Sequence, residues 1–182
     1  MTIKARSKAV AMPHPLLAKS APPSMNASAK PVALDVYRRA NPSQAEIRKM
    51  LSDVAEKEGI PPVILMGVAK TESNWTQFDQ QGKPLRGCDK QDIGIMQINE
   101  VAHPKAFPRA KYDPRYNIEV GAIYLKELYH RYGNWPDAVA AYNMGSVKED
   151  RKGHILNQSY IDSVRKNSLS FDPSAASLFA QG

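Results

Sequence analysis

Short amphipathic segments, each bounded by proline, glycine or a capping side chain, fill this chain from residue 42 to about residue 165. The clearest begins at Ser43, which suits an N-cap because Glu46 follows three residues later, and it ends before Gly59. Between these limits, apolar side chains recur at the three- and four-residue steps of one buried helix face; they are Ile47, Met50, Leu51, Val54 and Ala55. This punctuation predicts a small domain that is mainly α-helical.

Other segments carry the same helical signal. The prolines at 61–62 suit the first turn of a second helix, whose apolar face leads to Glu72. Residues 117–132 and 136–145 have the apolar spacing of two further helices, each followed or ended by glycine. A last helix is expected around residues 160–164.

Two intervals do not have the pattern of a regular helix. Residues 74–92 are polar and rich in turn formers, which favours a loop or a small irregular hairpin. The apolar run 93–98 is too short for periodicity to place it. Asn99 is expected to cap a brief helix that ends near Pro104. A small irregular or β-hairpin segment is therefore expected among the helices.

Most of the formal charge of +7 belongs to the first 41 residues, which hold seven basic residues against one acid, whereas the remainder holds 18 against 17. Five prolines, few large apolar residues and no sustained period predict an extended basic arm there. We therefore divide the chain into an arm (1–41), a folded domain (42–167) and a loose C-terminal tail (168–182). A basic arm suits an anionic partner.

Several other classes of protein are disfavoured. No stretch approaches about 18 uninterrupted apolar residues, so no membrane-spanning helix is expected. The amino-terminal segment is basic like a secretory leader, but residues 13–15 (Pro-His-Pro) interrupt its apolar part, which argues against an ordinary cleaved signal. The lone Cys88 cannot form an intramolecular disulfide, and the four histidines lack the spacing of a zinc site.

Glu72 is the most conspicuous titratable residue because it follows the apolar stripe to the end of its helix, next to Ser73, Asn74 and Trp75. Desolvation there is expected to raise its pKa and to keep the proton that a general acid needs. Taken alone, a helical glutamate is more often a solvated surface residue. The neighbouring residues therefore decide the interpretation.

Three blocks in order carry a resemblance to a known family. Residues 71–75 (Thr-Glu-Ser-Asn-Trp) resemble the Glu-Ser block of the lytic transglycosylases of the lysozyme superfamily, the soluble lytic transglycosylase-like (SLT domain) family. Residues 94–98 (Gly-Ile-Met-Gln-Ile) are similar to its Gly-Leu-Met-Gln block, and residues 141–145 (Ala-Tyr-Asn-Met-Gly) to its Ala-Tyr-Asn-Ala-Gly block. The resemblance covers roughly residues 45–165 and implies a lysozyme-like α-helical domain. Residues 77–90 do not align with it.

By matching position, the resemblance implies that Glu72 is the catalytic acid and base. It also implies a set of residues that line or support the sugar cleft: Ser73, Met96, Gln97, Tyr142 and Asn143. Tyr142 is expected to hydrogen-bond near Glu72, and amides such as Asn143 suit acetamido sugars because they both donate and accept hydrogen bonds. Ser73 would act through its hydroxyl group and Met96 through packing. No metal or organic cofactor is implied.

Three aromatic residues have two interpretations each. Trp75 and Trp135 suit either stacking on sugar rings or packing in the core. Tyr142 lies on the apolar side of its helix, so a core position is the alternative to its place in the cleft.

The implied function is that of a peptidoglycan lytic transglycosylase, which cleaves the β-1,4 bond between N-acetylmuramic acid and N-acetylglucosamine and leaves a 1,6-anhydromuramoyl end. One alternative is a hydrolytic muramidase resembling goose-type lysozymes, with Asp92 as the base that activates water. Another is an assembly protein of a virion or secretion apparatus with a vestigial catalytic domain.

The arm bears on where such an enzyme works. A wall-cutting domain joined to a basic arm without a convincing export signal favours an enzyme carried in a phage virion that acts in the host periplasm during entry. Virion proteins, DNA or a secretion apparatus would then be the partner of the arm. A periplasmic enzyme of a bacterial secretion apparatus is the alternative.

Overall fold

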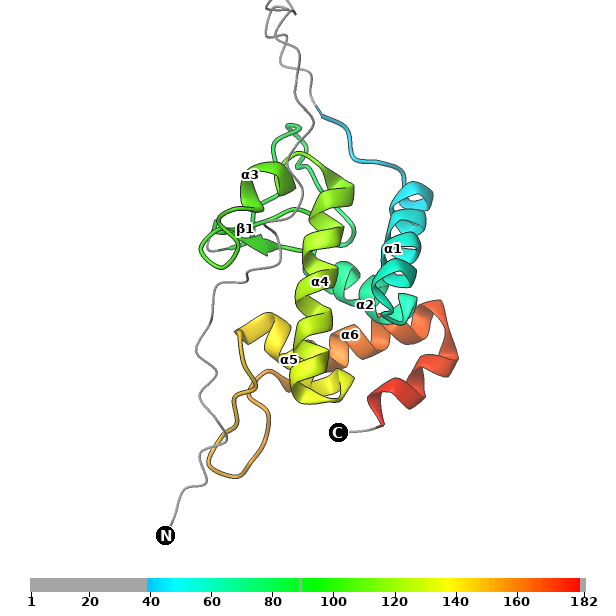
Figure 1. Cartoon of the computed structure of the whole chain (residues 1–182), viewed down its shortest axis with the longest axis vertical. Helices are drawn as coiled ribbons and strands as arrows, with labels where there is room; N and C mark the ends of the chain where they lie inside the picture. Colours follow the sequence, from blue (N-terminus) through cyan, green and yellow to red (C-terminus); the bar gives the residue numbers. More distant parts are fainter. Residues whose placement is uncertain (1–38, 89, 181–182) are drawn as a thin grey trace, which may run out of the picture. The chain divides into compact units, whose positions relative to one another are not determined.

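The computed structural model describes residues 39–88 and 90–180, so residues 1–38 of the arm expected over residues 1–41 lie outside the described part. Helices dominate that part, together with a two-stranded antiparallel sheet (Figure 1). The elements are α1 (Gln44–Glu58), α2 (Pro62–Ser73), β1 (Asp92–Ile93), β2 (Ile98–Asn99), α3 (Phe107–Ala110), α4 (Pro114–Tyr132), α5 (Trp135–Met144), α6 (Gln158–Phe171) and the 3-10 helix η2 (Pro173–Phe179). The prediction of a mainly α domain with a small β segment is confirmed.

The ends of α1 follow the sequence signals. The Ser43 side chain accepts a hydrogen bond from the backbone N–H of Glu46, and the Glu46 carboxylate accepts one from the backbone N–H of Ser43. Gly59 ends the helix in the left-handed region at φ 70°, where a residue with a Cβ would be strained. The capping box and the glycine therefore determine both ends of the helix.

Two helices begin earlier than the apolar spacing indicates. The Asp113 side chain accepts a hydrogen bond from the N–H of Tyr116 at 3.0 Å, so α4 starts at Pro114 rather than at residue 117. Asn134 likewise caps α5 through the N–H of Asp137 at 2.8 Å. An Asp or Asn followed closely by proline is the signal that apolar periodicity alone did not detect.

The prediction of a brief helix between Asn99 and Pro104 is wrong. Asn99 is the last residue of β2, and its side chain accepts hydrogen bonds from the N–H groups of Val101 and Ala102 in a turn. A residue that precedes proline is disfavoured in the α region, so a helix that reaches Pro104 is unfavourable. The helical turn α3 instead begins after it, at Phe107. The apolar run 93–98 forms the hairpin, in which Ile93 pairs with Ile98.

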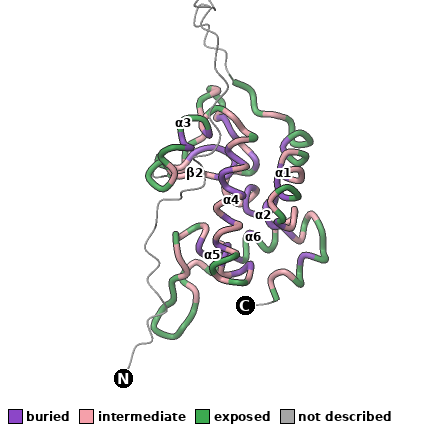
Figure 2. The backbone as a smooth tube through the Cα atoms, viewed as in Figure 1, coloured by how far each residue is buried: buried purple, intermediate pink, exposed green. Residues whose placement is uncertain are grey.

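The helix that carries Glu72 is deeply buried along half of its length. Six consecutive residues of α2, from Ile64 to Ala69, are buried, and Figure 2 shows this stretch of the tube as buried. Helix α6 packs along α2 and approaches it closely at Gly67, where an added Cβ would lie 2.9 Å from the carbonyl oxygen of Val164. The core therefore surrounds the helix that carries the acid.

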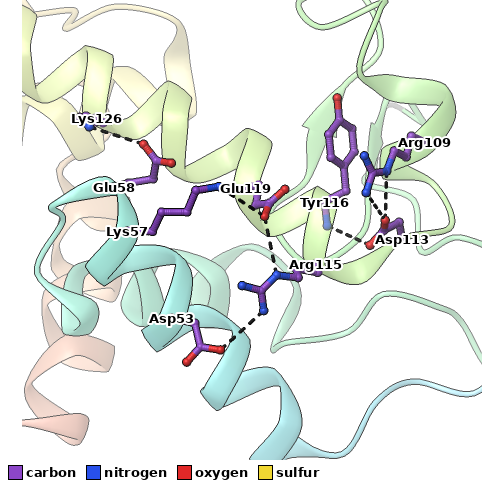
Figure 3. Close-up of polar contacts among 9 residues, drawn as sticks. All are labelled: Asp53, Lys57, Glu58, Arg109, Asp113, Arg115, Tyr116, Glu119 and Lys126. Carbon is purple, nitrogen blue, oxygen red and sulfur yellow. Dashed lines mark hydrogen bonds and ion pairs between the residues drawn. The ribbon is translucent and has the colours of Figure 1, made fainter. Parts of the chain in front are cut away.

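Ion pairs on the surface join α1 to α4 (Figure 3). Arg115 lies between Asp53 at 3.6 Å and Glu119 at 3.7 Å. Lys57 reaches Glu119 at 3.8 Å, and Lys126 reaches Glu58 at 3.4 Å. Partly exposed pairs of this kind contribute at most about 1 kcal/mol each, so the apolar contacts beneath them carry most of the stability of this interface.

The prediction of a loose tail from residue 168 onward is wrong for residues 168–180. Helix α6 continues to Phe171, and η2 follows it. The ring of Phe171 stacks on Trp75 with centroids 5.2 Å apart, and Ala175 is buried. Most residues of this segment are polar, so its few buried apolar residues form no pattern that predicts order from the sequence.

The folded part also begins before the predicted boundary at residue 42. Asn41 accepts hydrogen bonds from the N–H groups of Gln77 (2.6 Å) and Phe78 (2.8 Å) and donates one to the carbonyl of Phe78 (2.7 Å). Arg39 lies over the ring of Tyr112, 4.2 Å from its centroid. Among the residues described, no helix is long and apolar enough to cross a membrane.

Candidate active site

A cavity of about 290 Å³ opens between the hairpin and helices α4 and α5, with the end of α2 in its wall. Its lining residues are Glu72, Asp92, Gln97, Ile98, Asn99, Ala102, His103, Tyr124, Tyr142, Asn143 and Gly145. Four of the predicted site residues, one from the first block, one from the second and two from the third, therefore meet in one cavity.

The carboxyl group of Glu72 is held in a largely desolvated position. The hydroxyl group of Tyr160, from α6, donates a hydrogen bond to Oε1 of Glu72. Burial raises the pKa of Glu72 to about 7, the hydrogen bond from Tyr160 opposes the rise, and the negative charge of Asp92 adds to it. A carboxyl group with such a pKa exchanges its proton readily near neutral pH, as an acid–base catalyst must.

Tyr160 is the residue that the sequence interpretation missed. It was assigned only an apolar place in the last helix, and 88 residues separate it from Glu72. Tyr142, for which a hydrogen bond near Glu72 is expected, lines the same cavity and donates its hydroxyl hydrogen to the carbonyl oxygen of Met96 at 2.8 Å. Both tyrosines stay neutral, because burial raises the pKa of each well above its ordinary value and the charge of Glu72 raises it further.

Ser73 and Met96 support the cavity from behind its wall. The Ser73 hydroxyl donates to the carbonyl of Ile95 at 2.8 Å and accepts from the N–H of Thr76 at 3.1 Å. Met96 is fully buried, and its side chain packs against the backbone of α4 at Gly121, where an added Cβ would lie 2.7 Å from it. Neither side chain lines the described cavity, so both residues contact its wall from the side of the core.

The two amides predicted for the cleft are in its wall. Gln97 follows the hairpin turn, and its Nε2 donates to the carbonyl of Gly94 at 2.8 Å. Asn143, near the end of α5, accepts a hydrogen bond from Nδ2 of Asn157 at 3.0 Å. Each amide is thus oriented by one bond and retains other donor or acceptor positions.

Asp92 also lies in the cavity wall. It pairs with Asn99 across the hairpin, and Nδ2 of Asn99 donates to its Oδ1 at 2.8 Å. A second carboxylate beside an acid is the arrangement that hydrolytic glycosidases use. The cavity therefore contains both groups that the two alternative reactions require.

Neither tryptophan lines the cavity. Trp75 and Trp135 are buried and stack on Phe171 and Tyr129, respectively, which favours the core interpretation for both. Tyr124 and His103 line the cavity instead, with an edge-to-face contact of 5.2 Å between their ring centroids. Tyr124 lies on the helix that leads to the third block, but nothing in its spacing indicated a place in the cleft.

The described residues offer no group of three or more His, Cys, Asp or Glu side chains arranged to hold a metal ion. Cys88 is exposed and is a free thiol.

Known proteins resemble the chain in sequence and in fold. Residues 49–162 match the family described as the transglycosylase SLT domain. The chain is 30% identical over 107 residues to Protein IpgF of Shigella flexneri and, equally, to Protein IpgF of Shigella sonnei; the match covers 55% of this chain and 68% of each relative.

A solved structure resembles the fold as well. It is that of lytic transglycosylase Slt from Pseudomonas aeruginosa in an inactive mutant form, with a TM-score of 0.56 and 18% identity over 71% of this chain. This match spans 24% of the Slt chain, so it concerns one part of a longer protein. The Slt structure therefore shares the fold, and the match over residues 49–162 shows that the chain belongs to the transglycosylase SLT domain family.

Proposed function

We propose that the chain cleaves the glycan strands of peptidoglycan at the β-1,4 bond between N-acetylmuramic acid and N-acetylglucosamine, with Glu72 as the single acid and base. The observation that carries this proposal is the position of Glu72: a desolvated carboxyl group in the wall of an open cavity, with a pKa of about 7 and a tyrosine that orients it. Hydroxyl and amide side chains surround it, as a sugar substrate requires.

The reaction needs two proton transfers through Glu72, first from it and then to it. Protonated Glu72 donates its proton to the oxygen that leaves as the C1–O bond breaks, and the carboxylate then accepts the proton of the muramic acid 6-hydroxyl while that oxygen bonds to C1. No water is added, and Glu72 regains its initial protonation state. A pKa near 7 serves both steps because neither protonation state is strongly favoured.

The neighbours of Glu72 would hold the substrate. Gln97 and Asn143 offer amide groups to acetamido substituents, and Tyr142 fixes the backbone that precedes Gln97. The Slt structure is that of an inactive mutant in which glutamine replaces a glutamate, which supports the need for a carboxyl group in that enzyme.

The Glu72→Gln protein tests the role of the acid. The amide is nearly isosteric but cannot donate a carboxylic proton, so clearance of purified sacculi should fall by about 10²-fold or more. Circular dichroism shows whether the variant is folded. Clearance at the native rate by a folded Glu72→Gln protein would remove Glu72 from the mechanism.

The product distinguishes the proposed reaction from hydrolysis. Mass spectrometry of released muropeptides should find 1,6-anhydro ends, which are lighter than hydrolytic ends by one water and resist reduction by borohydride. Asp92 favours the second candidate, a hydrolytic muramidase, because it lies in the same cavity. Asp92→Asn should leave turnover within several-fold of native. Reducible ends together with a collapse of activity in Asp92→Asn would assign hydrolysis instead.

The substrate indicates the compartment. Peptidoglycan lies outside the cytoplasmic membrane, so we propose that the enzyme works in the bacterial periplasm. Delivery of the enzyme by a virion stays a prediction. So does the partner of the arm, for which virion proteins, DNA or a secretion apparatus are the candidates.

A further inference from the structure

The segment that does not align with the family blocks contacts the cavity wall at two points. Gln77, at its start, is a fully buried polar residue, and Gly87, near its end, lies beside the side chain of Gln97. Both residues lie against the turn between β1 and β2, residues 94–97. The last residue of this turn, Gln97, lines the cavity.

Gln77 holds this turn from inside the core. Its Oε1 accepts a hydrogen bond from the N–H of Ile95 at 3.1 Å. Its Nε2 donates to the carbonyls of Ala110 at 2.9 Å and Lys111 at 3.0 Å, at the end of α3. One buried amide therefore ties the turn to a separate helix, and its removal would leave three backbone groups without this partner.

Asn117 of α4 completes the inner support. Its Oδ1 accepts from the N–H of Met96 at 2.8 Å, and its Nδ2 donates to the carbonyl of Ile93 at 3.0 Å. Gly94 has φ 72°, and a Cβ added there would lie 2.5 Å from Oε1 of Gln77 and 2.6 Å from Nδ2 of Asn117. The two buried amides thus occupy the space beside Gly94 and hold the turn through its backbone groups.

Gln97 leaves this turn in an uncommon backbone conformation for a residue with a side chain, at φ 46°. Its amide also has little room on the outer side, because a Cβ added to Gly87 would lie 2.7 Å from its Oε1. Gly87 does not have the left-handed φ that would itself favour glycine. The absence of a side chain at residue 87 therefore leaves space for two side chains of the cavity wall, first the Gln97 amide and then Asp92, whose Cβ would lie 3.3 Å from the added Cβ.

We propose that Gln77 and Gly87 are positioning residues for glycan recognition: the first fixes the backbone before Gln97, and the second leaves the space in which the Gln97 amide meets an acetamido group of the substrate. This inference rests on the proposed function, because it takes the glycan as the occupant of the cavity. Residues 77–87 then determine how tightly substrate binds, separately from the acid–base chemistry of Glu72.

The test measures binding without turnover. In a Glu72→Gln background, isothermal titration calorimetry gives the Kd of a β-1,4-linked N-acetylglucosamine hexamer for three additional variants: Gly87→Ala, Gln77→Met and, as the control, Ser168→Ala. The Ser168 hydroxyl group is buried between α2 and α6 without a hydrogen-bond partner, so its removal changes the core and leaves the turn intact. NMR of the side-chain amide of Gln97 reports its position in the same proteins.

Gly87→Ala and Gln77→Met should each raise Kd about tenfold and shift the Gln97 amide resonances, whereas Ser168→Ala should do neither. Gly87→Ala keeps the test valid if Gln77→Met does not fold, because the closest group to the added Cβ, Oε1 of Gln97 at 2.7 Å, is the end of a flexible side chain, and the next, Cβ of Asp92 at 3.3 Å, need move by only a few tenths of an ångström. In the variants with Glu72 restored, KM should rise while the pH profile stays native.

The outcomes separate the two levels of the argument. If the parent protein binds the hexamer and Gly87→Ala binds it equally well, the positioning role is wrong, whether or not the Gln97 resonances move. If the parent binds no glycan at all, the proposed function fails first and the inference fails with it.

Discussion

Three influences act on the pKa of Glu72, and they do so in different directions. Burial favours the neutral carboxyl group, and so does the negative charge of Asp92, whereas the hydroxyl group of Tyr160 favours the carboxylate. The neutral form is the one that donates to the leaving oxygen. Tyr160 therefore orients the acid at the expense of some of its proton affinity.

Removal of this hydroxyl group should move the pH dependence of cleavage in one direction. In Tyr160→Phe, the pKa of Glu72 should rise above about 7, because the bond that stabilises the carboxylate is lost. The alkaline limb of kcat/KM should therefore shift to higher pH, even though maximal activity falls as the carboxyl group loses its orientation. Asp92→Asn removes a negative charge and should shift the same limb to lower pH. Shifts in the same direction in both variants would contradict the assignment.

The same pKa affects stability. A carboxyl group whose pKa is raised in the folded state binds more protons there than in the unfolded chain, so its contribution is full below the ordinary value of 4.5 and is lost as the pH rises through about 7. Glu72→Gln should remove that loss. Thermal unfolding should give similar Tm values for the variant and the native protein near pH 4.5, and a higher Tm for the variant near pH 8. A native protein that is the more stable of the two near pH 8 would be inconsistent with a buried, ionising Glu72.

At the scale of elements, α6 and η2 complete the core around the helix that carries the acid. Phe171 stacks on Trp75, which follows α2 directly, and the indole N–H of Trp75 donates to the carbonyl of Met66 at 3.2 Å. The end of α2 is therefore held by residues from the last part of the folded chain. Glu72 is one turn away from this contact, so the stack contributes to the rigidity of the site.

Loss of this stack should destabilise the whole domain. Phe171→Ala removes a half-buried ring that pairs with a buried indole, which should cost roughly 1–3 kcal/mol in the free energy of unfolding. Urea denaturation followed by tryptophan fluorescence measures it, with Leu156→Ala as the control because Leu156 is 57% exposed. Equal midpoints for the two variants would mean that Phe171 contributes nothing beyond a surface residue.

Local signals predicted most elements and one half of the site. The cap at Ser43 and the stop at Gly59 lie next to the residues they affect, and Glu72 follows an apolar stripe that is visible within two turns. The partner of Glu72 is different, because nothing near Tyr160 in the sequence distinguishes it from a core tyrosine. Gln77 likewise has the composition of a loop residue, and only the fold shows that it is buried between α3 and the hairpin turn. Contacts across long sequence separations have no period or spacing that could reveal them.

At the scale of the whole molecule, positive charge and chemistry occupy different parts of the chain. Residues 1–38 contain six basic residues and one acidic residue, and all the residues of the cavity lie beyond them. Asn41, although assigned to the arm from sequence, is bonded to the loop at Gln77 and Phe78. We therefore propose that deletion of residues 1–38 removes most of the positive charge of the arm without disturbing the folded domain.

Two truncations test this division. Deletion of residues 1–38 should leave cleavage of isolated peptidoglycan at the native rate but weaken binding to duplex DNA, used as a polyanion probe. The difference from the full chain should vanish as salt rises from about 50 mM to about 300 mM. Deletion of residues 1–41 should also lower Tm, since two N–H groups and one carbonyl lose the Asn41 side chain. A folded protein without residues 1–38 that has lost turnover would show that the arm takes part in catalysis.

The hydrogen bond between Tyr160 and Glu72 also makes the site dependent on the order of synthesis. A ribosome delivers the chain from its amino end, so Glu72, Gln97 and Asn143 all emerge before the tyrosine does. The helix α6, which packs along α2, emerges with that tyrosine. A nascent or prematurely terminated chain that stops at α5 thus has the acid but neither its tyrosine nor the helix that covers α2. We therefore expect such a chain to lack the proposed glycan-cleaving activity, which would arise only after nearly all of the folded domain has been made.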